Sequence, residues 1–91
     1  MKVFHYTDVE ASEVSEAGAS GVTIRWVLDE RVGANNFVMR VFDVEPGGYT
    51  PRHAHPWEHE VFILEGQGQV WGNGEWRDFG PGSVVFVPPD E

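Results

Sequence analysis

Short apolar segments separated by turn residues make up most of the chain after residue 20. Residues 23–28 (TIRWVL) are rich in β-branched and aromatic side chains, and residues 37–44 (FVMRVFDV) are apolar at all but two positions. Residues 61–64 and 83–87 form two further apolar runs. Their length and composition are typical of β-strands, and no segment shows sustained helical periodicity. The pattern therefore predicts an all-β protein.

Glycine-containing turn signals separate these segments. Residues 46–48 (PGG), 66–68 (GQG) and 81–82 (PG) predict turns. Asn73-Gly74 lies between two tryptophan-containing segments and predicts a type I′ hairpin with positive φ at both positions. Residues 10–21 are acidic and small, which favours an exposed loop with at most a short helical turn. Many short strands separated by such turns predict a sandwich or a barrel.

The interior of this barrel is expected to come from the larger apolar side chains of the strands. The pattern does not decide which face of each strand points inward, because several runs are apolar at consecutive positions. The expected core residues are Ile24, Trp26, Val38, Phe42, Phe62, Leu64, Val85 and Val87.

Composition narrows the function classes. A chain of 91 residues predicts a single domain, residues 1–91. A formal net charge of −9 repels phosphate backbones, so nucleic-acid binding is not expected. Without cysteine the chain has neither disulfides nor thiolate ligands. No apolar run approaches the roughly 20 residues that a membrane-spanning helix needs. The first residues also lack an apolar signal core, so the expected location is the cytoplasm.

Three of the four histidines fall within residues 53–59 (HAHPWEH). On an extended strand His53 and His55 point to the same side, and Pro56 predicts a bend that brings His59 back toward them. Three imidazoles favour Mn, Fe, Co, Ni, Cu or Zn over Ca or Mg. The alternative is a set of solvated histidines on an exposed strand. His5 stands apart and is interpreted as a surface or packing residue.

The spacing around these histidines resembles a known motif. Gly47, His53, His55, His59 and Gly66 follow the first cupin motif, G-x5-H-x-H-x3/4-E-x6-G, with His59 in the usual glutamate position. The chain after residue 20 is similar to small bacterial single-domain cupins whose metal is held by four histidines. The resemblance implies a cupin-type double-stranded β-helix, or jelly-roll barrel. It also implies a divalent transition metal held by His53, His55 and His59, with Mn, Fe, Cu, Ni and Zn as candidates.

The second cupin motif, G-x5-P-x-G-x2-H-x3-N, begins at Gly82 and continues to Pro88, with Asp90 at its second glycine. Its histidine would fall two residues beyond Glu91. The resemblance therefore implies a barrel that is incomplete at its C-terminal end, with water as the first candidate for the fourth ligand. Unpaired strand edges favour association. A homodimer, or an exchange of strands between two copies, is accordingly expected.

Four further residues are candidates for the surroundings of the metal. Glu60 could orient a ligating imidazole through its second ring nitrogen, the alternative being a solvated surface carboxylate. Trp57 is the best candidate to line a substrate pocket, although tryptophan is more often a packing or interface residue. Phe37 and Met39 are expected to line the interior of the barrel and to take no part in the chemistry.

Three functions compete at this point. The first is a metal-dependent oxidoreductase, with oxidase or dioxygenase chemistry on a small molecule, because an all-histidine ligand set leaves open positions on the ion. The second is a cupin module that binds a small molecule or a metal without turnover. The third is a structural remnant with little or no metal affinity. No catalytic residue is assigned.

Overall fold

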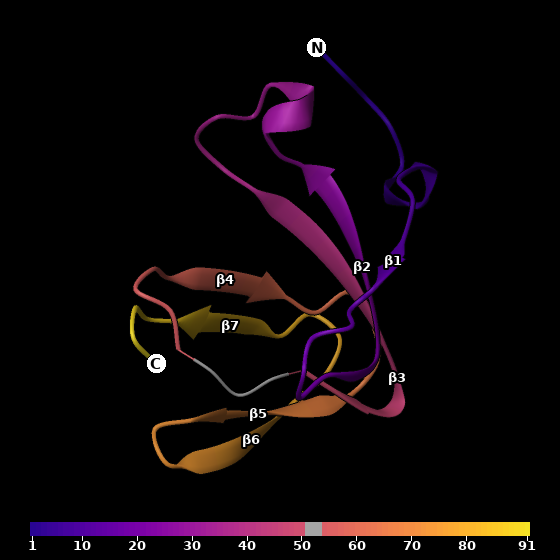
Figure 1. The fold of residues 1–91 in the computed structure, drawn as a ribbon. Coiled ribbons are helices and arrows are strands. Elements are labelled where there is room, and N and C mark those ends of the chain that lie inside the picture. The colour runs from indigo at the N-terminus through magenta and orange to yellow at the C-terminus, as the bar shows by residue number, and fades with distance from the viewer. Residues whose placement is uncertain (51–53) are drawn as a thin grey trace. The chain divides into compact units, whose positions relative to one another are not determined.

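The computed structural model describes residues 1–50 and 54–91, and the chain divides into two compact units, Met1–Pro51 and Arg52–Glu91 (Figure 1). Almost all regular structure is antiparallel β-strand, which confirms the predicted all-β class. The prediction of one domain over residues 1–91 stays a prediction. No helix in the described ranges is long and apolar enough to cross a membrane.

The first unit is built on a three-stranded sheet in the order β1-β2-β3. Its strands are β1 (Ser12–Glu13), β2 (Ser20–Leu28) and β3 (Met39–Tyr49). β1 lies within the segment expected to be a loop, where it pairs with the middle of β2. The predicted strands at residues 23–28 and 37–44 correspond to parts of β2 and β3.

A bulge in β2 decides which side chains are buried in this unit. Val22 and Ile24 are buried and lie two residues apart, as expected for one face of a strand. The register then shifts between Trp26 and Leu28, which inserts one extra residue. Val27 is therefore buried, whereas Trp26 is exposed with its ring 5.2 Å from the Arg40 guanidinium. The prediction that Trp26 is a core residue was wrong for this reason.

The glycine pair at residues 47 and 48 does not form a simple turn. β3 continues through it, and the register moves from Val22 opposite Val44 to Ser20 opposite Tyr49. Gly47 has φ +81°, a conformation that favours glycine. At position 48 a Cβ atom would lie 2.7 Å from the Ser20 carbonyl oxygen. The PGG segment thus makes a wide bulge inside a strand, and it requires glycine because two backbones approach closely.

Two short 3-10 helices, which the sequence pattern did not predict, flank the sheet. In η1 (Tyr6–Asp8), the His5 side chain caps the N-terminus by accepting from the Thr7 backbone N–H. In η2 (Glu30–Val32), Asp29 is the cap and pairs with the Arg31 guanidinium at 2.8 Å. Hydrogen bonds from the Arg31 side chain lower the pKa of Asp29. The Arg31 side chain is largely exposed to solvent, so this pair adds little to stability.

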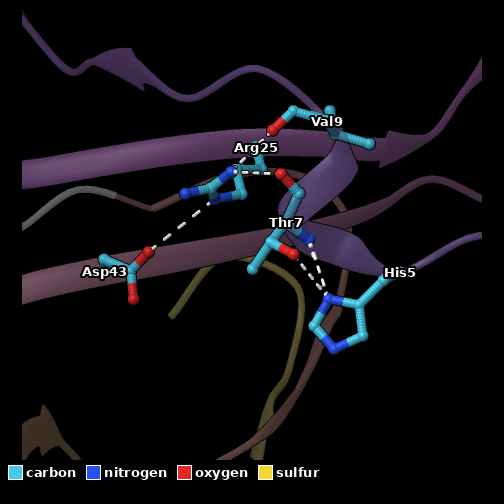
Figure 2. Close-up of polar contacts among 5 residues, drawn as sticks. All are labelled: His5, Thr7, Val9, Arg25 and Asp43. Atoms are coloured by element: carbon cyan, nitrogen blue, oxygen red, sulfur yellow. Dashed lines mark hydrogen bonds and ion pairs between the residues drawn. The ribbon is translucent and has the colours of Figure 1, made fainter.

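Arg25 connects the N-terminal segment to the sheet (Figure 2). Its Nη1 donates to the Val9 carbonyl oxygen at 2.7 Å and to the Thr7 carbonyl oxygen at 3.3 Å. Its Nε lies 3.9 Å from an Asp43 carboxylate oxygen on β3 and is buried without a hydrogen bond. One guanidinium thus joins residues 7–9 to β2, and these contacts are mainly to backbone carbonyls.

The second unit contains two antiparallel pairs. β4 (His59–Phe62) pairs with β7 (Val84–Val87), and β5 (Gly68–Gly72) pairs with β6 (Glu75–Phe79). In the turn between β5 and β6, Asn73 has φ 51° and Gly74 has φ 76°. Positive φ at both positions is what the predicted type I′ hairpin requires. Gly66 and Gly82 also have positive φ, in agreement with the turns predicted there.

The predicted core was only partly correct. Ile24 is buried, and Val85 and Val87 are half-buried. The other expected core residues are exposed: Trp26, Val38, Phe42, Phe62 and Leu64. On β4, Phe62 lies opposite the exposed Val84, on the other face of the pair from Val85 and Val87. The apolar run does not say which face is covered, because adjacent residues of a strand point to opposite faces.

The contacts of Arg25 lead to a first prediction. Arg25→Leu removes two charge-assisted hydrogen bonds to backbone carbonyls, so the free energy of unfolding should fall by about 1–2 kcal/mol. Urea titration followed by circular dichroism measures this change. Arg31→Leu is the matched control, since its guanidinium is exposed and pairs with Asp29. Equal unfolding midpoints for the two variants would show that the Arg25 contacts do not stabilise the fold.

Candidate metal and ligand site

Two of the three predicted ligands, His55 and His59, lie at or just before the start of β4, in the second unit. His59 is the first residue of β4, and His55 lies in the segment that leads into it. The Asp90 backbone N–H donates to the His55 carbonyl oxygen at 2.6 Å, so this segment is held beside the residues that follow β7. His53, the first predicted ligand, lies outside the described residues.

The side chains of His55, Trp57 and His59 form one cluster of rings, here called the ring cluster. The His55 and Trp57 rings are stacked, with 4.5 Å between centroids and 5° between planes. The His55 and His59 centroids are 5.5 Å apart, and the rings meet at 64°. The bend expected at Pro56 agrees with this arrangement, in which residues four positions apart bring their rings together.

A hydrogen bond defines the state of one imidazole in the ring cluster. The Trp57 indole Nε1–H donates to His59 Nε2 at 3.1 Å. Because an indole nitrogen can only donate, Nε2 must carry a lone pair. The neutral imidazole therefore has its proton on Nδ1, and its Nε2 is a nitrogen of the type that binds transition metals.

The described residues supply two of the three ligands of the predicted metal site, His55 and His59. Two imidazoles lie in one cluster, and their nitrogens suit Zn, Mn, Fe, Ni or Cu. Within residues 1–50 and 54–91 no three histidine, aspartate or glutamate side chains gather closely enough to hold an ion. The structure thus brings His55 and His59 together, and the complete three-histidine site stays a prediction.

Strand register places Glu60 on the opposite face of β4 from His59. His59 lies opposite Val87, and Glu60 lies opposite Phe86. Directly opposed residues of an antiparallel pair share a face, and successive residues alternate between faces. Glu60 therefore shares its face with three exposed apolar side chains, namely Phe62, Val84 and Phe86.

The other three predicted neighbours divide between the two units. Trp57 belongs to the ring cluster and is 53% exposed, so much of its indole faces solvent. Phe37 and Met39 are exposed and belong to the first unit, where Met39 is the first residue of β3. Their role as wall residues stays a prediction.

A small hollow of about 120 Å³ lies along β5 and β7. Its lining includes the apolar side chains of Val70, Trp71, Val85 and Val87 and the charged side chains of Arg77 and Glu91. Val87 is the cross-strand partner of His59, and Val85 is two residues before it on the same face. From the sequence, Val85 and Val87 were predicted only as core residues. The signal that connects them to the site is the register of β7 against β4, which requires the pairing to be known.

Comparison with known proteins identifies the family. The sequence profile of the cupin domain family matches residues 40–91. Among solved structures, the polyketide cyclase RemF from Streptomyces resistomycificus is similar, with 45% sequence identity and a TM-score of 0.91. The alignment covers 100% of this chain and 66% of RemF, so the chain spans just under two thirds of that protein's length. No curated protein sequence matches the chain.

The family match begins in β3, includes the ring cluster and extends through β7. The similarity to RemF covers the whole chain. Both findings fit the jelly-roll type of all-β fold that the resemblance to the cupin motif implied. The chain belongs to the cupin family.

Proposed function

We propose that this chain is a metal-dependent cupin that closes a ring in a polyketide-type substrate without net oxidation. The observation that carries the proposal is the 45% identity to a polyketide cyclase over the full length of the chain. The ring cluster supports it, because two imidazoles and an exposed indole lie at one place. The chain spans 66% of RemF. Cyclase activity of this chain is therefore a proposal, and RemF is the protein for which that activity is named.

His53, His55 and His59 are the proposed ligands of a divalent transition metal. When bound, such an ion supplies Lewis-acid chemistry, polarising a carbonyl oxygen and stabilising the negative charge of an enolate. In the chain itself, the His55 and His59 rings lie 5.5 Å apart and meet at 64°. The Trp57 ring is stacked on His55, and its indole N–H donates to His59 Nε2.

The chemistry of ring closure fits the surroundings of the ring cluster. An enol carbon of a poly-β-ketone joins a ketone carbon, the ketone oxygen leaves as water, and no electrons are lost or gained overall. Trp57 provides an exposed aromatic surface for a flat, conjugated chain. No described residue is assigned as a general base.

Oxidase or dioxygenase chemistry is the second candidate function. An all-imidazole ligand set without thiolate suits redox-active Mn, Fe or Cu and leaves positions open for dioxygen. A cupin that binds a small molecule without turnover is the third. A homodimer and a cytoplasmic location likewise stay predictions.

The metal ligands can be tested by substitution. His59→Ala should abolish stoichiometric binding of Zn(II) or Mn(II), because it removes a ligating nitrogen. Glu60→Ala should change binding by less than about 10-fold, because Glu60 lies on the opposite face of β4 from His59. Isothermal titration of the metal-free protein measures both effects. The reverse ranking would show that Glu60, and not His59, binds the ion.

The reaction class can be tested with a synthetic poly-β-ketone thioester and metal-loaded protein. We expect a cyclised product that has lost water and has gained no oxygen, and we expect it to form equally well without dioxygen. Mass spectrometry of the product and an oxygen electrode provide the readouts. His59→Ala should slow the reaction by roughly 100-fold or more, because developing charge loses its stabilisation. An oxygenated product that forms only with dioxygen present would favour the oxygenase instead.

A further inference from the structure

Trp57 contacts His55 and His59 in different ways. Its ring stacks on His55, and its indole N–H donates to His59 Nε2. We propose that Trp57 is a reversible cap on His59, which holds the Nε2 lone pair until a metal ion displaces the indole. This inference rests on the proposed metal binding at the same site, and it adds a residue that controls access to the ion.

The Nε2 atom of His59 can accept only one bond at a time. A neutral imidazole has a single ring nitrogen with a lone pair, and in His59 this nitrogen accepts from the Trp57 indole at 3.1 Å. A metal ion bound through Nε2 needs the same lone pair. The hydrogen bond and the metal bond therefore exclude each other, and metal binding through this atom must break the contact with Trp57.

The position of Trp57 allows such a displacement. Its side chain is 53% exposed, so it can rotate toward solvent without disturbing buried neighbours. Before the ion arrives, the indole keeps the proton of His59 on Nδ1 and the lone pair on the atom that will bind metal. After the ion arrives, the released indole can present its face to a flat substrate. The cap thus links metal binding to the opening of an aromatic surface.

Trp57→Phe is the variant that separates these roles. Phenylalanine keeps an aromatic ring next to His55 but has no N–H to donate. Without a competing hydrogen bond, the affinity of the protein for Zn(II) should increase by roughly 3- to 10-fold. Competition with a chromophoric chelator measures this affinity. Trp76→Phe is the matched control, because Trp76 is also exposed and its nearest aromatic partner is Trp71, so its affinity should be unchanged.

The unmodified protein gives an independent readout by NMR. Addition of Zn(II) should move the indole N–H resonance of Trp57 toward the position of a solvent-exposed indole, in proportion to the ion bound. The Nε2 resonance of His59 should report an accepting nitrogen before the ion is added. These signals depend on the cap and not on catalytic activity.

These experiments distinguish failure of the cap from failure of the proposed metal site. Unchanged or weaker Zn(II) binding by Trp57→Phe, or a Trp57 indole resonance that does not move on titration, overturns the cap. If the unmodified protein binds Zn(II) normally in that case, the proposed metal site stands without it. If the unmodified protein does not bind Zn(II), Mn(II) or Fe(II), both the cap and the proposed metal site are wrong.

Discussion

The pairing of β4 with β7 is the constraint on which the histidine site depends. It places His59 opposite Val87, and it turns Glu60 to the other face of the pair. The hydrogen bond from Asp90 to His55 then holds the preceding segment beside the residues after β7. Within this frame, a short segment interrupted by Pro56 brings two imidazoles and an indole together. A slip of one residue in the pairing would exchange the positions of His59 and Glu60.

The sequence contained enough information for the strands, several turns and the location of the histidine cluster. Strand length and composition indicated the elements, and Asn73-Gly74 specified its hairpin because few residues tolerate positive φ. The bulges were not predictable in the same way. At Val27 one extra residue reversed the alternation of β2, and at residues 45–48 a wide bulge replaced the expected turn. Both depend on pairing between distant segments, which local patterns do not encode.

The ring cluster was likewise predictable from the sequence only in part. Spacing alone indicated that His55 and His59 belong to one site, and the resemblance to cupins put His59 at the position of the motif's usual glutamate. The stacking of Trp57 on His55 and its hydrogen bond to His59 were not predictable, because they depend on side-chain orientation after a bend. They change the interpretation of Trp57 from a candidate pocket wall to a residue that contacts a proposed ligand directly. Membership of the cupin family then connects this geometry with a fold that hosts many reactions.

The central claim is that imidazoles of the ring cluster bind one transition-metal ion. Anomalous scattering from crystals grown with Zn(II) tests it most directly, because it locates the ion and its ligands together. The account predicts one strong peak in contact with ring nitrogens of His55 and His59, at about 2.0–2.1 Å from each. Absence of a peak at saturating Zn(II), or a peak bound by other residues while these two rings remain uncoordinated, would contradict it.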